Sequence, residues 1–248
     1  MSRVSRAFRL SGRLIKFLFT LLIAFVCGMV FWRLCSSATP KEMERLVPND
    51  ALYEAYEAEG ESLYVFRQEQ RSITSGTKNY GYFSVEHAAF VPSADQVQIA
   101  LRYNNSTIRA LCEDYGLEQT PSREDELFDI TLVLAFDLTP EDETDNATND
   151  PESVRFVRCH ADSISSMEKN LYNYRKVVFD LSTCGVDLAD VLEDGSLLAV
   201  YCDVYYAEDV DYEAYAYGTL CLYDYKSENL TVKVDKATWE ALKTYGED

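Results

Sequence analysis

The chain has 248 residues, with 42 acidic and 23 basic side chains and a formal net charge of −19. The acid is concentrated from Asp50 onward, where 15 Lys and Arg stand against 40 Asp and Glu, a net charge of −25. A field of this sign repels nucleic acids and anionic lipid surfaces, so neither is an expected partner of this part. Aromatic residues make up 13% of the chain, which excludes a disordered polyelectrolyte.

The first 33 residues have the pattern of a membrane-targeting segment. An unbroken apolar run from Phe17 to Trp32 follows five cations: Arg3, Arg6, Arg9, Arg13 and Lys16. A helix from Leu14 to Trp32 would be about 28 Å long, close to the ~30 Å core of a bilayer. Cationic flanks stay on the cytoplasmic side. We therefore predict a cytoplasmic basic tail at 1–13, a transmembrane anchor at 14–33 and an extracytoplasmic C-terminal domain.

A cleaved signal peptide is the alternative interpretation of this segment. Signal peptides have shorter apolar cores, of roughly 7–15 residues, followed by small residues at the cleavage site. Ser36-Ser37-Ala38 would provide such a site before Thr39. The length of the apolar run favours a retained anchor.

Residues 34–61 are predicted to hold a tether followed by a short helix. Pro40 and Pro48 lie among mixed charges, which is typical of a linker. The helix is expected to begin after Asp50 as N-cap and to stop at Gly60.

Alternation of apolar and polar residues dominates from 62 to 235, which indicates half-buried strands. The predicted strands are 63–66, 83–91, 97–103, 128–138, 154–161, 177–181, 197–206, 214–225 and 230–234. The clearest is 128–138, where Leu132 and Leu134 are expected in the core and Asp129 and Thr131 on an exposed face. Short helices are expected at 106–115, ended by Gly116, at 186–192, and at the C-terminus in 236–248.

This order predicts a mainly β domain at 62–235, built as an antiparallel β-sandwich with short peripheral helices. The succession of elements from Tyr82 to Tyr225 is similar to an immunoglobulin-like or fibronectin-type-III-like module. The resemblance is architectural, because the Cys–Trp–Cys core pattern of immunoglobulin domains is absent from the sequence.

Two strands, 197–206 and 214–225, are expected to form a hairpin. Its register decides whether Cys202 and Cys221 can form a disulfide. If facing residue numbers sum to 423, Cys202 lies opposite Cys221. A slip of one residue places Leu220 or Leu222 there instead. The two leucines favour the slipped register, and therefore no Cys202–Cys221 bridge. We expect at most one disulfide among the five cysteines beyond the anchor: Cys112, Cys159, Cys184, Cys202 and Cys221.

Acidic residues cluster at 141–152 and at 208–213, and calcium prefers such oxygen ligands. Asp142, Asp145, Asp209 and Asp211 are the candidate metal ligands, although a mobile loop and a solvated hairpin tip explain the same clusters. Asp209-Val210-Asp211 also matches the Asp-x-Asp that some Golgi glycosyltransferases use to hold a metal-bound nucleotide sugar. The βα alternation on which nucleotide-sugar binding usually rests is missing. No other cofactor is expected.

The chain has two histidines, His87 and His160, and a catalytic triad would need one of them. His160 directly follows Cys159, but sequence neighbours in a strand point to opposite faces and cannot act as thiol and base without a bulge. His87 lies in a predicted strand. No catalytic residue is therefore assigned.

These observations predict a single-pass membrane protein with an outward β-sandwich that binds or supports a protein or another component of the cell envelope. The alternative is a membrane-tethered enzyme of the envelope or secretory lumen, metal-dependent through the acidic loops. A third hypothesis is a subunit of a membrane complex that uses its anchor helix for assembly. Converging carboxylates would favour the enzyme, and an exposed apolar or Tyr-rich patch would favour binding.

Overall fold

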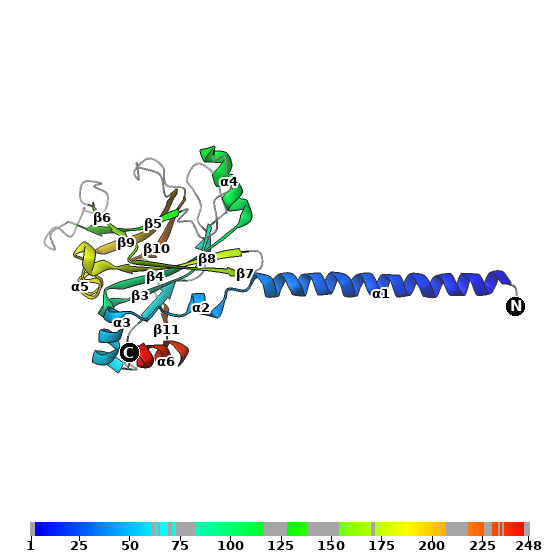
Figure 1. Cartoon of the computed structure of the whole chain (residues 1–248), viewed down its shortest axis with the longest axis horizontal. Coiled ribbons are helices and arrows are strands. Elements are labelled where there is room, and N and C mark those ends of the chain that lie inside the picture. Colours follow the sequence, from blue (N-terminus) through cyan, green and yellow to red (C-terminus); the bar gives the residue numbers. More distant parts are fainter. Residues whose placement is uncertain are drawn as a thin grey trace. The chain divides into compact units, whose positions relative to one another are not determined.

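The computed structural model describes residues 3–60, 63, 65–68, 71–72, 83–116, 128–137, 154–169, 172–206, 218–225, 230–232, 234 and 236–245. The chain forms two compact units, Met1–Ala38 and Thr39–Asp248 (Figure 1). The first is a single helix, and the second is a mainly β unit with two antiparallel sheets.

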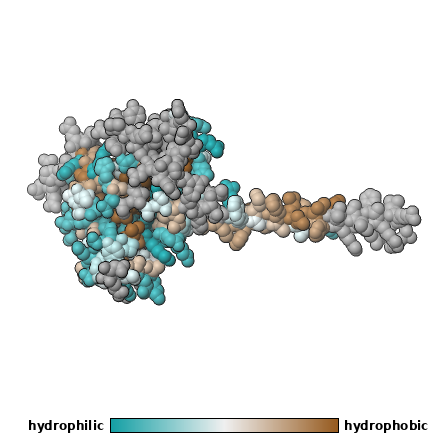
Figure 2. Space-filling view, viewed as in Figure 1, coloured by the Kyte–Doolittle hydropathy of each residue, from teal (hydrophilic) through white to brown (hydrophobic). Residues whose placement is uncertain are grey.

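Helix α1 (Arg3–Ser37) carries the apolar run of the N-terminus. Its segment Ile15–Cys35 is long and apolar enough to cross a membrane, and none of it is buried within the chain (Figure 2). The prediction of a helix of membrane-spanning length is confirmed, with the apolar segment shifted one to two residues from 14–33.

The larger sheet, sheet A, has seven strands, and its order is β11-β1-β3-β4-β8-β7, with β2 paired to β3. Its strands are β1 (Val65–Gln68), β2 (Arg71–Ser72), β3 (Phe83–Val91), β4 (Gln96–Asn104), β7 (Ser163–Lys169), β8 (Tyr172–Asp180) and β11 (Leu230–Val232). Every pair is antiparallel. Strand β7 and the first half of β8 were not predicted, because their polar residues hide the alternation.

The smaller sheet, sheet B, has four antiparallel strands in the order β10-β9-β5-β6. Its strands are β5 (Phe128–Asp137), β6 (Val154–His160), β9 (Leu197–Tyr206) and β10 (Gly218–Asp224). Strand β5 lies at the centre, so its predicted apolar face is the middle of a hydrophobic layer.

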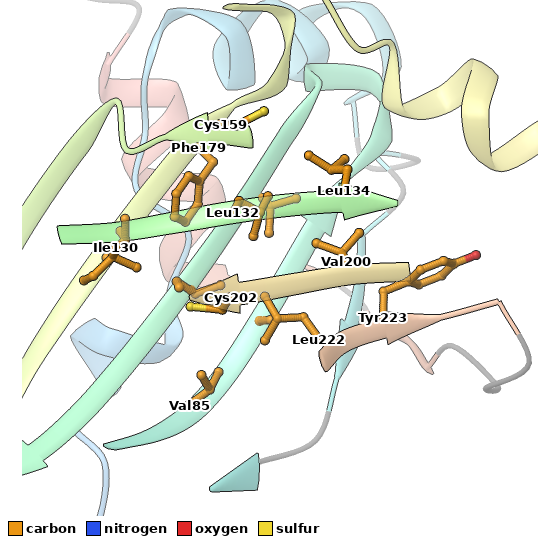
Figure 3. Close-up of a cluster of buried hydrophobic side chains, with 14 of the residues drawn as sticks. Val85, Ile130, Leu132, Leu134, Cys159, Phe179, Val200, Cys202, Leu222 and Tyr223 are labelled. Carbon is orange, nitrogen blue, oxygen red and sulfur yellow. The ribbon is translucent and has the colours of Figure 1, made fainter. Parts of the chain in front are cut away.

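One hydrophobic cluster contains side chains of both sheets (Figure 3). Leu132 and Leu134 of β5 are fully buried in it, as predicted, and residues of sheet A such as Ile99 and Phe179 belong to the same cluster. The two sheets therefore share one core, and groups of their strands alternate along the chain.

The prediction that Thr131 is exposed is wrong, because its side chain is 0% exposed. Alternation correctly sorts it to the face opposite Leu132, but that face is also covered. Arg158 of β6 donates from Nη1 to the Tyr205 hydroxyl of β9 over 3.2 Å, and the strand pairing places Thr131 between them. Asp129, on the same face, is half-buried.

The β9–β10 hairpin adopts the slipped register. Leu220 lies opposite Cys202, and neither Cys202 nor Cys221 is part of a disulfide, so the prediction of no bridge between them is confirmed. A bulge after Cys221 then shifts the pairing by one. The bulge allows Leu222 and Tyr223, adjacent in the chain, both to be buried in the shared core.

A layer of helices covers the other face of sheet A. It contains α2 (Lys41–Glu44), α3 (Asp50–Glu59) and α6 (Lys236–Tyr245). Apolar residues of α3 and α6, among them Leu52 and Leu242, form a second cluster with Ala89 and Val91 of β3. The rings of Tyr56 and Trp239 join the two helices, with centroids 5.0 Å apart. The side chain that caps α3 is Asn49, which accepts from Leu52 N, and not the predicted Asp50.

Residues 39–49, here called the strap, lie on sheet A, although the sequence assigned them to a tether. Met43 and Leu46 are buried. The Gln98 side chain of β4 pairs with the backbone of Val47 twice, accepting from its N–H at 2.7 Å and donating to its carbonyl at 3.1 Å. Lys176 of β8 donates to the Met43 carbonyl at 3.2 Å. Polar strand residues thus satisfy the backbone groups of a segment that has no ladder of its own.

We expect the substitution Gln98→Leu to lower the free energy of unfolding by about 1–3 kcal/mol, because it leaves the partly buried N–H and carbonyl of Val47 without partners. Limited proteolysis should then cleave the strap faster than in the wild type. Ser165→Leu, a change to leucine at an exposed position on β7, is the control. Equal protease resistance of the wild type and Gln98→Leu would contradict this role of Gln98.

The remaining helical segments are α4 (Asn105–Tyr115), η2 (Pro92–Ala94), η5 (Leu181–Cys184) and α5 (Leu188–Glu193). Gly116 ends α4 in a left-handed conformation with φ 60°, as predicted for a glycine stop. Asp95 after η2 holds η5 and α5 in place, since its carbonyl accepts from Leu181 N at 2.8 Å and its carboxylate from Leu188 N at 2.7 Å.

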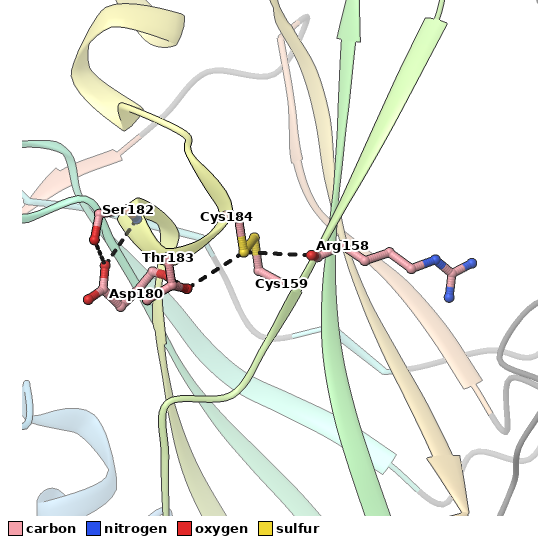
Figure 4. The surroundings of a disulfide bond; sticks show 6 residues. All are labelled: Arg158, Cys159, Asp180, Ser182, Thr183 and Cys184. Carbon is pink, nitrogen blue, oxygen red and sulfur yellow. Dashed lines mark hydrogen bonds between the residues drawn. A yellow bond between two sulfur atoms is a disulfide. The ribbon is translucent and has the colours of Figure 1, made fainter.

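One disulfide joins the two sheets. It connects Cys159 on β6 to Cys184 at the end of η5, with the Cα atoms 5.8 Å apart (Figure 4). Since η5 directly follows β8, the bridge fixes the edge strand of sheet B to the end of a sheet A strand. Cys112 is free, and the expectation of at most one bridge beyond the anchor agrees with the structure.

Candidate functional site

The four candidate metal ligands, Asp142, Asp145, Asp209 and Asp211, lie outside the described residues. Within the described part of the chain, no group of three or more His, Cys, Asp or Glu side chains is placed to hold a metal ion. The hypothesis of a calcium site in the acidic loops therefore stays a prediction.

The two histidines have different surroundings. His160 is exposed on β6, whereas its neighbour Cys159 is fully buried and bonded to Cys184. The thiol of Cys159 is thus committed to the bridge, in agreement with the argument that the two side chains point apart. His87 is buried on sheet A, and its Nε2 lies 3.0 Å from Lys176 Nζ beneath the strap.

The surface that stands out is the solvent-facing side of β6. Phe156 has 61% of its surface exposed, and Arg155, Arg158 and His160 are exposed as well. Strand pairing sets Phe156 opposite Ala135 and His160 opposite Thr131, so Phe156, Arg158 and His160 share the face of sheet B that points away from the shared core. We call these three residues the β6 face.

A chain of hydrogen bonds runs from the β6 face across sheet B. Arg158 Nη1 donates to the Tyr205 hydroxyl at 3.2 Å, and that hydroxyl donates to Asp203 Oδ2 at 3.1 Å. Burial, and then the Asp203 charge, raise the pKa of Tyr205 against the opposing effect of Arg158. The phenol consequently stays protonated and continues to donate to the carboxylate.

Two buried oxygens beside this chain have no hydrogen-bond partner, Thr131 Oγ1 and Asp203 Oδ1. The two residues are direct cross-strand neighbours on β5 and β9. A buried polar atom without a partner costs about 1–3 kcal/mol. Sheet B therefore carries polar groups on this face that its own packing does not satisfy.

The chemistry available on this face is recognition. A guanidinium has five N–H donors in a planar fork that matches a carboxylate. Arg158 is held beside an exposed aromatic ring of the same strand, and the Tyr205 contact fixes the direction of its side chain. In Figure 4 the Arg158 side chain extends away from the disulfide, while its backbone carbonyl oxygen lies 3.6 Å from Cys184 Sγ.

Sequence reasoning missed this surface, although one signal was present. The strand Val-Arg-Phe-Val-Arg-Cys-His at 154–160 contains two arginines and no acid, within a region of net charge −25.

Comparison of the chain with known protein families, curated proteins and solved structures found no match.

Proposed function

We propose that this protein is a single-pass membrane protein whose extracytoplasmic β-sandwich is a binding module for another protein of the cell envelope. The observation that carries the binding role is the β6 face, where an exposed phenylalanine stands beside arginine on an otherwise acidic unit. Aromatic residues and arginine are the types enriched in protein interfaces.

The membrane part of the proposal rests on α1. Its apolar segment Ile15–Cys35 has no buried residue. A bilayer would cover it. Arg3, Arg6, Arg9 and Arg13 precede the segment and Lys16 lies at its start, and cationic flanks favour the cytoplasmic side. The unit from Thr39 onward would then be extracytoplasmic.

The sandwich assignment is supported by the core that both sheets share and by their antiparallel strands. The Cys159–Cys184 bridge supports the location, since disulfides persist in oxidising compartments outside the cytoplasm.

The topology predicts how protease will act on intact cells that carry the protein with a C-terminal epitope. Added protease should remove the epitope from intact cells, while a second epitope ahead of Arg3 survives until the cells are lysed. Moving the cations to the far side of the segment, by exchanging Arg3, Arg6 and Arg9 for Ser and adding three Arg after Ser37, should reverse the pattern. Survival of the C-terminal epitope in intact wild-type cells would contradict the proposal.

The binding role is tested by photo-crosslinking in the cells that produce the protein. A photoreactive residue is placed singly at exposed positions on four elements: Phe156 on β6, Arg109 on α4, Ser165 on β7 and Glu193 on α5. A discrete crosslinked product of the same mass in repeated preparations, at one position at least, is expected of a binding module. If none of the four positions gives a crosslinked product, the proposed binding role is contradicted.

A further inference from the structure

We propose that the β6 face, together with Arg155, is the docking surface of this module, and that its occupant is an acidic, extended segment of another polypeptide. This inference rests on the proposed binding function and names the site and the partner class. It follows from the charge, the exposure and the position of β6 at the edge of sheet B.

Charge complementarity is the first argument. Arg155 and Arg158 lie on a strand without acidic residues, in a region whose net charge is −25. At physiological ionic strength charges are screened beyond about 8 Å, so a docked segment feels the arginines beside it far more than the distant acid. Carboxylates of the partner can form bidentate pairs with either guanidinium, the strongest geometry available to arginine.

The donors of Arg158 are sufficient for this role. One of its N–H groups is used on the Tyr205 hydroxyl, and the guanidinium has five. Because Tyr205 is in turn bonded to Asp203, the arginine is oriented before a partner arrives. Pre-orientation lowers the entropy that binding must overcome.

The strand position supplies the second argument. In the order β10-β9-β5-β6, no described strand pairs with the second edge of β6. Edge strands present backbone donors and acceptors, which an extended polypeptide can satisfy and a lipid headgroup cannot. Cys184 meets this edge at Arg158, so the part toward Val154 is the one offered to a partner. Phe156, exposed in that part, provides an apolar anchor.

A second copy of this chain fits the surface poorly. Two β6 strands side by side would bring arginines of both copies together, and like charges in facing positions destabilise strand pairs. An acidic partner removes this cost and turns the arginines into contacts.

Fluorescence anisotropy with the full-length protein in neutral detergent micelles tests the proposal. The probe is a labelled, terminally blocked peptide of roughly eight alternating glutamate and threonine residues, long enough to lie along β6 as a strand. The expected result is saturable binding that weakens by at least about tenfold, or ~1.4 kcal/mol, in Arg158→Glu and in Phe156→Ser. Arg109→Glu, the same charge change on α4, should leave affinity within about twofold. Near-UV circular dichroism confirms that each variant is folded, and Arg158→Gln should give an intermediate affinity.

Three outcomes would overturn the proposal. The first is no binding of the acidic peptide, or equal binding of a lysine–threonine peptide. The second is equal loss of affinity in Arg109→Glu and Arg158→Glu. The third is displacement of the peptide by dihexanoyl-phosphatidylserine micelles at comparable phosphate and carboxylate concentrations, which would indicate an anionic lipid. Crosslinking in cells shows whether the β6 face alone is the wrong docking surface or whether the protein is not a binding module at all. Products at Glu193 or Ser165 without one at Phe156 would exclude this surface alone, and their absence everywhere would exclude a binding module.

Discussion

Replacing Leu132 by alanine is expected to lower the free energy of unfolding of the β unit by ~2–5 kcal/mol. Leu132 is 0% exposed at the centre of β5 and lies in the cluster shared by both sheets, so truncation removes buried apolar surface and leaves a cavity. The cavity is costly because neighbours on two sheets cannot all move to fill it. Denaturant melts of the intact protein in detergent, followed by near-UV circular dichroism, measure the loss.

The matched control is the next residue, which points to the other face. Thr131→Val keeps the shape of the side chain and removes a buried hydroxyl that has no partner. Replacing an unsatisfied buried group by an apolar one is close to neutral or stabilising. The free energy of unfolding of Thr131→Val should therefore be no more than about 1 kcal/mol below that of the wild type, or above it. A Thr131→Val loss as large as that of Leu132→Ala would show that the hydroxyl has a partner, or that the faces of β5 are wrongly assigned.

Removing the Cys159–Cys184 bridge should lower the free energy of unfolding by an amount comparable to that of Leu132→Ala. The bridge closes a loop of 25 residues, and the chain-entropy relation gives about 3–4 kcal/mol for a loop of this length. The double substitution Cys159→Ala with Cys184→Ala removes the bridge without adding a free thiol. We expect lower stability by that amount and faster hydrogen exchange in β6, which is joined to η5 through this bond.

Cys221→Ala is the control for the bridge, since Cys221 is not part of a disulfide. Peptide mapping without reductant should recover one linked pair of peptides that contains Cys159 and Cys184, with Cys202 and Cys221 in unlinked peptides. Equal stability of the double variant and the wild type under oxidising conditions would contradict the role assigned to the bridge.

Alternation along the chain was sufficient to predict the strands whose residues are strongly apolar on one side. Strand β5 and the β9–β10 hairpin belong to this class, and a leucine opposite Cys202, either Leu220 or Leu222, was predicted from the cost of turning two leucines outward. The bulge that buries Leu222 and Tyr223 together was beyond such an argument. Alternation assumes one residue per position, and a bulge inserts another.

Polar residues account for the places where the structure differs from the prediction made from the sequence. Gln98 and Lys176 are buried on sheet A because the strap covers them, and a sequence does not show that a distant segment will supply that cover. The same holds for Thr131 beneath the Arg158–Tyr205 contact. The acidic residues that attracted the search for a metal lie outside the described residues, whereas the β6 face depends on which strand stands at an edge. Edge position is a property of the sheet order, which local pattern does not determine.

The strap has a mechanical consequence. Any tension that reaches the β unit through the chain ahead of Thr39 enters at the strap. The contacts that bear it first join the strap to three strands, with Glu86 on β3, Gln98 on β4 and Lys176 on β8. These contacts are side-chain hydrogen bonds outside the strand ladders of both sheets. Under load we therefore expect the strap to detach as a first, small extension, and the sheets to rupture only at a higher force. In a single-molecule pulling experiment Gln98→Leu would lower the force of the first step and leave the second unchanged.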